Sequence, residues 1–63
     1  MYVHEEFLNR QVILITKTRD LKGTLVEHIG KGHNSHCLLA TPEGIVEIPD
    51  NEIMCTILVR EYP

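Results

Sequence analysis

The stretch VILITKTRDLKGTLV, residues 12–26, decides the fold that this sequence predicts. Its first half, Val12–Thr18, is a continuous run rich in β-branched residues, which favours a strand. Arg19-Asp20 indicates a turn, and the alternation in Leu21–Val26 favours a second strand. Gly23 lies inside that strand, where a glycine indicates a bend or the close approach of another backbone. The stretch therefore predicts two strands joined by a tight turn.

Three further strands are expected beyond this stretch, separated by short breaks. The breaks are the glycine-rich loop Gly30–Asn34, the reverse turn Thr41–Gly44 and the corner Pro49–Asn51. The strands between and after them are Cys37–Ala40, Ile45–Ile48 and Ile53–Val59. Before the first strand, His4–Arg10 has acidic residues early and a basic residue late, which suits a short helix. The pattern predicts one all-β domain over residues 1–63: a five-stranded, strongly bent antiparallel barrel, Sm-like or SH3-like, with a short N-terminal helix.

Two of these strands are apolar on both faces, which predicts assembly. Val12–Ile15 and Ile57–Val59 do not alternate apolar with polar residues, as a half-buried antiparallel strand would. A 63-residue domain has a small core and commonly needs a partner, a metal or disulfides. A barrel curved strongly enough to shield both faces within one chain is the alternative. We expect a homo-oligomer in the form of a ring. Its interface is expected to contain Ile57, Leu58, Val59, Ile45 and Val46.

Composition limits the class of protein. The formal charge is −3, from six Lys and Arg against nine Asp and Glu, which argues against broad non-specific nucleic-acid binding but allows a local site. The first ten residues do not resemble a signal peptide, and the longest apolar runs are far too short to span a membrane. Two cysteines, Cys37 and Cys55, do not make a disulfide framework and are expected as buried small side chains. We expect a cytoplasmic protein without a membrane partner.

The whole pattern resembles the Sm-like superfamily, the small barrels that include LSm proteins and Hfq. The resemblance extends from about Phe7 to Val59. Leu21-Lys22-Gly23-Thr24-Leu25 is similar to the first half of the Sm1 motif, and Asn34 is similar to the family's loop asparagine. Ile48–Ile53 occupies the place of the Sm2 motif, although Pro49 and Asp50 stand where the family usually has arginine and glycine. The resemblance implies an oligomeric scaffold, with itself or related Sm-like subunits as partners, that binds single-stranded RNA or nucleotides.

The loop between the second and third strands contains the candidate RNA-binding residues. They are Lys31, His33, Asn34 and His36, with His28 beside them. Imidazole offers a stacking face, an amide can read base edges and lysine supplies charge. A polar, solvated loop without a specific role is the alternative. Around the first turn, Lys17, Arg19 and Lys22 form a basic cluster that could contact phosphates or could be an ordinary solvated turn.

Metal binding and catalysis have weaker support. His33-x-x-His36-Cys37, with His28, contains possible zinc ligands, but neighbouring residues of a strand such as His36 and Cys37 point to opposite faces. The acidic residues near the turns, Glu43, Glu47, Asp50 and Glu52, are expected to form a solvated face. We therefore expect no enzyme activity, no metal and no cofactor. The alternative to the RNA scaffold is a protein–protein interaction module that has lost its nucleic-acid site, which the acidic balance and the missing Sm2 arginine favour.

Overall fold

The structure is a single antiparallel sheet of five strands. It is a computed structural model that describes residues 7–30 and 32–60. The strand order is β4-β3-β2-β1-β5. Two short 3₁₀ turns, η2 and η3, precede β3 and β5. In chain order the elements are β1 (Gln11–Thr16), β2 (Asp20–Ile29), η2 (Gly32–Asn34), β3 (His36–Thr41), β4 (Gly44–Pro49), η3 (Asp50–Glu52) and β5 (Ile53–Leu58).

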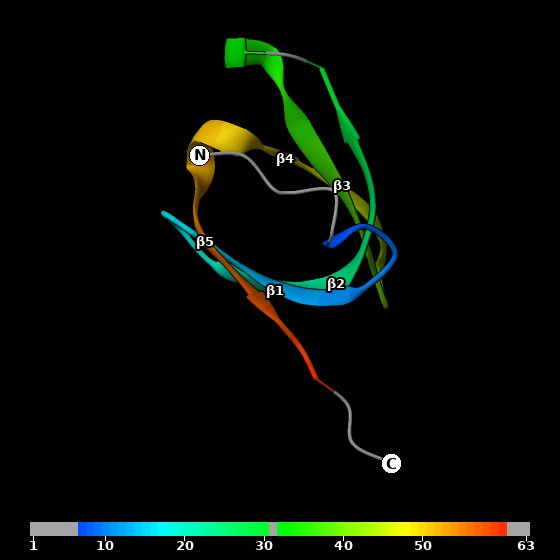
Figure 1. Ribbon diagram of the computed structural model, residues 1–63. Helices are drawn as coiled ribbons and strands as arrows, with labels where there is room; N and C mark the ends of the chain where they lie inside the picture. Colours follow the sequence, from blue (N-terminus) through cyan, green and yellow to red (C-terminus); the bar gives the residue numbers. More distant parts are fainter. Residues whose placement is uncertain (1–6, 31, 61–63) are drawn as a thin grey trace.

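The sheet curves around an apolar interior but does not close. In Figure 1, β1 and β2 lie below this interior, β3 and β4 rise along one side, and η2 stands at the top. The all-β fold with five antiparallel strands is confirmed, whereas the closed barrel is wrong: β4 and β5 are the two edges of the sheet and do not pair with each other. Pairing ends there because β4 bonds only to β3 and β5 only to β1 among the described residues.

The expected N-terminal helix is absent from the described part of His4–Arg10. Residues 7–10 form a turn, in which the Arg10 N–H donates to the Phe7 carbonyl oxygen at 3.2 Å. Asn9 has a φ of 64°, in the left-handed region, and a helix cannot continue through it. The Asn9 N–H instead donates to the Leu25 carbonyl oxygen at 2.7 Å, which ties this turn to β2. Residues 4–6 lie outside the described residues.

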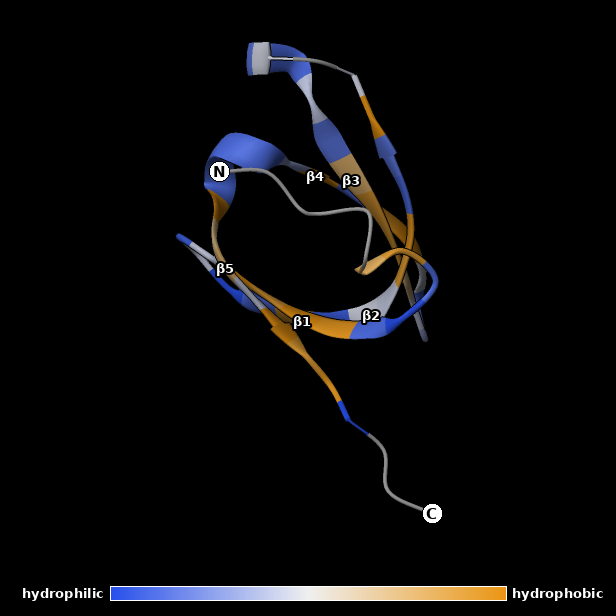
Figure 2. Ribbon diagram, in the orientation of Figure 1, coloured by the Kyte–Doolittle hydropathy of each residue, from blue (hydrophilic) through white to orange (hydrophobic). Residues whose placement is uncertain are grey.

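The core lies on the inner face of the curved sheet. Its fully buried members are Val12, Leu14, Leu25, Cys37, Leu39 and Ile48, with Phe7 and Leu8 packed against them. The outer face of β1 carries Ile13 and Ile15, which are half-buried. Figure 2 shows the hydrophobic colouring along β1 and into the end of β5. The inner face is therefore well covered, and the outer face of β1 and β5 is the more exposed apolar surface.

Gly23 lies close to the backbone of β3. A Cβ added at this position would lie 2.3 Å from the carbonyl oxygen of Ala40, which is backbone and cannot move aside cheaply. The sequence prediction of a close backbone approach is confirmed. The bend in the sheet thus requires glycine at this position because any side chain would push β2 and β3 apart.

The variant Gly23→Ala is expected to lower the free energy of unfolding by about 1–3 kcal/mol, the usual cost of overpacking. Urea denaturation followed by circular dichroism measures this change. The exposed neighbour Lys22 provides the control, because Lys22→Ala is expected to stay within about 0.5 kcal/mol of the wild type. Equal midpoints for the two variants would contradict the packing argument.

No helix in the described ranges, 7–30 and 32–60, has the length and apolar character needed to cross a membrane.

The two cysteines differ in their burial. Cys37 is buried, as expected, whereas Cys55 is exposed on β5, so the expectation of a buried thiol is wrong for Cys55. Cys55 is exposed because it lies on the outer face of the edge strand, opposite Ile15 of β1. Both thiols are free.

Candidate functional site

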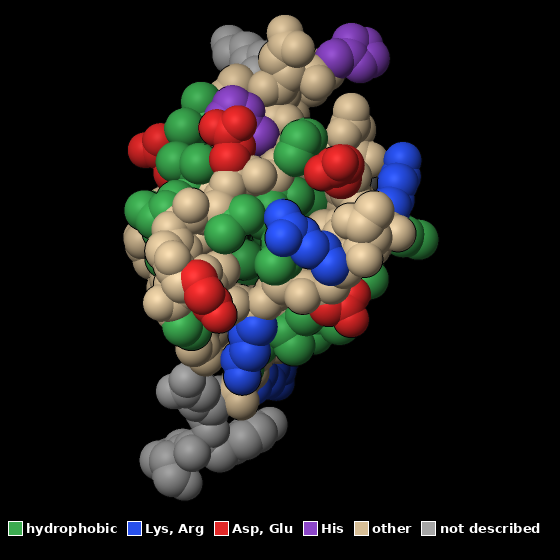
Figure 3. Space-filling model, turned by 180° about the vertical axis from the view of Figure 1, so that it is seen from behind, with side chains coloured by type: hydrophobic (Ala, Val, Ile, Leu, Met, Phe, Trp, Pro, Cys, Tyr) green, Lys and Arg blue, Asp and Glu red, His purple; other side chains and the backbone are tan. Residues whose placement is uncertain are grey.

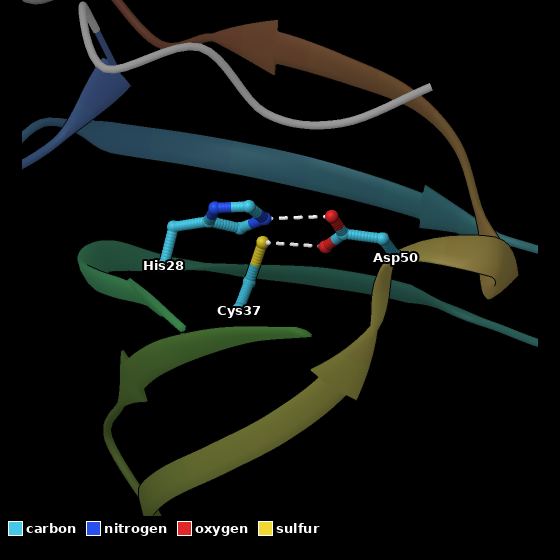
Figure 4. A group of neighbouring side chains, drawn as sticks. All are labelled: His28, Cys37 and Asp50. Carbon is cyan, nitrogen blue, oxygen red and sulfur yellow. Dashed lines mark hydrogen bonds and ion pairs between the residues drawn. The ribbon is translucent and has the colours of Figure 1, made fainter. Parts of the chain in front are cut away.

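A polar cluster lies beneath the end of the molecule that carries η2. It consists of His28 near the end of β2, Ser35 just before β3, Cys37 on β3 and Asp50 at the start of η3. Figure 4 shows the His28 ring and the Cys37 sulfur both directed at the Asp50 carboxylate. Segments far apart in the sequence therefore converge on one acidic group.

A β-bulge in β2 aims His28 into this cluster. Leu25 lies opposite Leu39, and Glu27 lies opposite Leu38, so the register shifts by one residue between these two pairs. Beyond the bulge, His28 lies opposite Cys37, whose side chain is fully buried. Residues directly opposite each other in an antiparallel pair share a face of the sheet. Without the extra residue, the His28 side chain would point outward.

Asp50 is the hub of the cluster, and it is buried, with a relative exposure of 7%. Its Oδ2 lies 2.6 Å from His28 Nε2 and accepts a hydrogen bond from Ser35 Oγ at 2.8 Å. Its Oδ1 accepts a longer bond from the Cys37 thiol at 3.4 Å. The Asp50 backbone N–H also donates to the Ser35 carbonyl oxygen at 3.0 Å, which holds η3 against the segment after η2. The expectation that Asp50 belongs to a solvated acidic face is wrong, because these donors replace its water.

The surroundings shift two pKa values in opposite directions. Burial alone would raise the pKa of Asp50, but hydrogen bonds from His28, Ser35 and Cys37 outweigh it and hold that pKa below its ordinary value. Burial raises the pKa of the Cys37 thiol to about 12, assisted by the hydrogen bond to Asp50 and its charge. Cys37 is therefore a protonated donor near neutral pH, and it is not activated as a nucleophile.

The chemical capacity of this cluster follows from its groups. A carboxylate beside a histidine and a hydroxyl resembles the parts of a catalytic triad, but the serine Oγ donates to the carboxylate and not to the histidine. In a catalytic triad the serine hydroxyl must donate to the histidine, which acts as its base, and that contact is not the one seen here. The arrangement instead suits a structural network or the coordination of an ion, because its histidine nitrogen, sulfur and carboxylate oxygen face one another.

Three of the four candidate RNA-binding residues, His33, Asn34 and His36, belong to the η2 turn and the start of β3, next to this cluster. His33 and Asn34 belong to η2 and are exposed, whereas Lys31 lies outside the described residues. His36 opens β3 and is half-buried, with its Nε2 3.3 Å from Glu47 Oε2 and its Nδ1 3.2 Å from the Asn34 carbonyl oxygen. The structure thus brings His33 and Asn34 to one exposed turn and directs His36 towards an acidic neighbour on β4.

The basic cluster lies elsewhere on the molecule. Lys17 and Arg19 are exposed in the turn between β1 and β2, and Lys22 is exposed on β2. Arg19 and Lys22 line an open groove of about 890 Å³, together with two acidic residues, Asp20 and Glu43. Figure 3 shows histidines towards one end of this face, and basic side chains mainly towards its middle and other end. The groove is therefore lined by both basic and acidic side chains, and it is separate from the η2 turn.

The residues expected at an oligomer interface lie on the two edge strands. Ile57 and Ile45 are exposed, at 46% and 65%, and their side chains lie on the outer face. Leu58 and Val46 are half-buried and pack against the core, and Val59 is half-buried just beyond β5. The edges thus contain both core-facing and outward-facing members of the predicted set.

Sequence reasoning missed the cluster as a unit. His28 was considered with the loop histidines, Cys37 was expected to be a buried thiol or a possible ligand beside His36, and Asp50 was expected on a solvated acidic face. One signal was present: Ser35, just before β3, lies two residues from Cys37, a spacing that places both on one face if the extended chain continues, and Asp50 directly follows the apolar strand β4. The bulge that turns His28 inward has no signature in the residues around Val26.

No family model matches the chain, and searches of curated proteins and of solved structures found no match.

Proposed function

We propose that this chain is a self-assembling scaffold, Sm-like in type, that joins copies of itself through its two sheet edges and binds single-stranded RNA at the η2 turn. The observation that carries the proposal is the two edge strands: within residues 7–30 and 32–60 each pairs with a neighbour on one side only, and both carry exposed apolar side chains. On β4 this is Ile45, 65% exposed, and on β5 they are Met54 and Ile57, 63% and 46% exposed.

The two edges suit head-to-tail assembly. An open edge presents unpaired N–H and C=O groups that a strand from another chain can satisfy. Because the edges are different strands of one curved sheet, pairing β5 of one copy with β4 of the next is a heterologous contact. Such contacts close into a ring when the rotation between copies allows it.

The RNA part of the proposal depends on the exposed η2 turn. His33 offers a ring for stacking and Asn34 an amide for base edges, and both side chains are exposed. A ring would repeat this turn once per copy around a common axis, so that weak contacts from each copy add by multivalency. The net charge of −3 is consistent with a small local site and not with a broad phosphate-binding surface.

Native mass spectrometry and fluorescence anisotropy test the two parts together. We expect an oligomer of defined size that binds short U-rich or A-rich RNA, with affinity lowered about tenfold by Asn34→Ala, the loss of about 1.4 kcal/mol. Asn51→Ala, at an exposed asparagine in η3, is the matched control and should leave affinity unchanged. An intact oligomer that binds neither RNA at low salt would reject the RNA site, and a monomer would reject the scaffold.

A second candidate function is a protein-interaction module. His36 lies beside the carboxylate of Glu47, and Asp50, in the place of the Sm2 motif, is engaged in the buried network. The Glu47 carboxylate would offset positive charge on His36, and Asp50 supplies no positively charged donor where the Sm2 motif has arginine or glycine. Both features weaken the case for an RNA-binding surface. In this case the edges would bind a different chain, and pull-down with the wild type would recover a hetero-complex in preference to the homo-oligomer.

A further inference from the structure

Three side chains of different donor chemistry meet at one buried point. One atom each from His28, Cys37 and Asp50 lies within 4.8 Å of the other two, and the residues come from β2, β3 and η3. We propose that these three residues form a binding site for a single zinc ion, beneath the η2 turn. This inference does not depend on whether the chain assembles or binds RNA.

The donor set selects the class of ion. Imidazole nitrogen, thiolate sulfur and carboxylate oxygen are the three ligand types of zinc sites in proteins. Sulfur excludes Ca²⁺ and Mg²⁺, which bind oxygen ligands almost exclusively. A thiolate and a carboxylate together balance the two positive charges of the ion, and neutral histidine adds none. The complex is then electrically neutral, which lowers the cost of burying it.

Two contacts of Asp50, one at each carboxylate oxygen, are close to the spacing that tetrahedral zinc requires, and the three ligand atoms as a set lie within 4.8 Å of one another. Zinc bonds of about 2.0–2.3 Å place neighbouring ligand atoms roughly 3.3–3.7 Å apart. The Cys37 sulfur already lies 3.4 Å from Asp50 Oδ1. His28 Nε2 lies 2.6 Å from Asp50 Oδ2, so this pair must separate by less than about 1 Å. We expect a change in the His28 side-chain torsions to provide that movement.

Ser35 holds the Asp50 carboxylate in place through Oδ2, the oxygen that His28 also contacts. Ser35 Oγ donates to Asp50 Oδ2 at 2.8 Å and the Asp50 backbone N–H donates to the Ser35 carbonyl oxygen at 3.0 Å. Hydrogen bonds of this kind fix the orientation of metal-ligating carboxylates. Ser35 itself is buried, with a relative exposure of 7%, so its contact with Asp50 does not compete with water. Ser35 is thus a positioning residue for the proposed site.

Binding exchanges protons for the ion. The Cys37 S–H bond breaks, its proton passes to solvent, and the sulfur forms a bond to zinc. The proton that His28 Nε2 shares with Asp50 must also leave Nε2, either to solvent or by a shift of the neutral ring to its Nδ1–H form. Nε2 and the carboxylate then both form bonds to the ion. No electron is transferred. The His28 side chain is 22% exposed, which gives the ion a route from solvent. The three residues supply three of the four tetrahedral positions, and water or a bound ligand would supply the fourth.

Cobalt(II), followed by zinc(II), tests the site on the reduced full-length chain after treatment with a chelator. We expect one cobalt per chain, with a thiolate-to-cobalt charge-transfer band and the visible bands of tetrahedral cobalt, both abolished when zinc displaces it. Two cysteines make a matched pair. Cys55→Ser should keep the band, whereas Cys37→Ser should lose it and bind zinc at least tenfold more weakly. Ser35→Ala should weaken zinc binding about 10- to 100-fold and keep the band.

Each other outcome overturns the proposal. A wild-type chain that keeps its far-ultraviolet circular dichroism but shows no charge-transfer band does not bind the ion through Cys37. A band that survives Cys37→Ser or disappears in Cys55→Ser places the ion at the exposed thiol. Should Cys37→Ser fail to fold, cadmium-113 NMR of the wild type decides: a signal without a sulfur ligand, or more than one signal per chain, rejects the site.

Discussion

Asp50→Ala is expected to remove most of the stability of this domain. Asp50 accepts hydrogen bonds from the buried Ser35 hydroxyl and the buried Cys37 thiol, and it pairs with His28. Alanine removes the carboxylate that these three side chains share, although the Ser35 hydroxyl keeps the Gly32 carbonyl oxygen at 2.9 Å as an acceptor. Breaking a buried pair from one side costs about 3–5 kcal/mol. A single core of this size rarely supplies more than about 3–5 kcal/mol in total. The variant should therefore be largely unfolded at room temperature.

Urea denaturation at neutral pH, in the presence of a chelator, measures the effect on the metal-free protein. Glu52→Ala, an exposed acid in the same turn η3, is the control and should change the free energy of unfolding by less than about 0.5 kcal/mol. Asp50→Asn keeps one acceptor oxygen and should lie between the wild type and Asp50→Ala. If Asp50→Ala unfolds at the same urea concentration as Glu52→Ala, the network has no stabilising role.

The strands could be predicted because their signals are local. The β-branched run after Gln11 and the turn residues near Pro42 and Pro49 show where strands begin and end. Gly23 could be interpreted for the same reason, since a glycine inside a strand indicates a backbone contact. These features depend on neighbours in sequence, and all of them correspond to observed elements.

The parts that failed depend on distant contacts. The N-terminal helix was expected from charge order, but Asn9 bonds to Leu25 of β2 and stops it. Closure of the barrel depends on whether β4 and β5 meet, and no pattern within either strand decides that. The buried network required one bulge, at Val26, which reverses the face of every later residue in β2. If the alternation of side chains along β2 is continued from Leu25 without a bulge, His28 is predicted on the outer face of the sheet, whereas the structure has it on the inner face.

Ile57 and Leu58 illustrate why an assembly test needs the structure. The sequence treats both as members of one apolar edge, but Leu58 packs inward on the core, whereas Ile57 is exposed on the outer face. Replacing Leu58 by a charged residue would unfold the chain for reasons unrelated to assembly. A useful test must alter the free edge of β5 and leave the pairing of β5 with β1 intact.

The hydrogen-bond register of β5 identifies such a position. The Val59 N–H donates to the Gln11 carbonyl oxygen at 3.0 Å, so this pair is hydrogen-bonded. Hydrogen-bonded and non-hydrogen-bonded pairs alternate along an antiparallel ladder. Leu14 and Thr56, three pairs further along the register, therefore form a non-hydrogen-bonded pair. It follows that the Thr56 N–H points away from β1, towards the open edge.

Thr56→Pro is accordingly expected to dissociate the proposed oligomer while the single chain stays folded. Proline removes the N–H that a neighbouring strand would bind, and its ring obstructs the approach of that strand. The interface loses about 3 kcal/mol, which raises the concentration needed for assembly by about 100-fold. Sedimentation velocity over a dilution series measures this shift, with circular dichroism as the check on folding.

Two variants at neighbouring positions separate the edge from the strand itself. Thr56→Ala keeps the outward N–H and should assemble as the wild type does. Ile57→Pro removes an N–H from the hydrogen-bonded pair with Ile13, so it should damage the fold of the single chain. If Thr56→Pro retains the wild-type mass at every dilution, the backbone edge of β5 is not the interface. A folded monomer with Thr56→Pro, beside an oligomer with Thr56→Ala, assigns assembly to the backbone of this edge, because the two variants differ chiefly in one N–H group and the ring that replaces it.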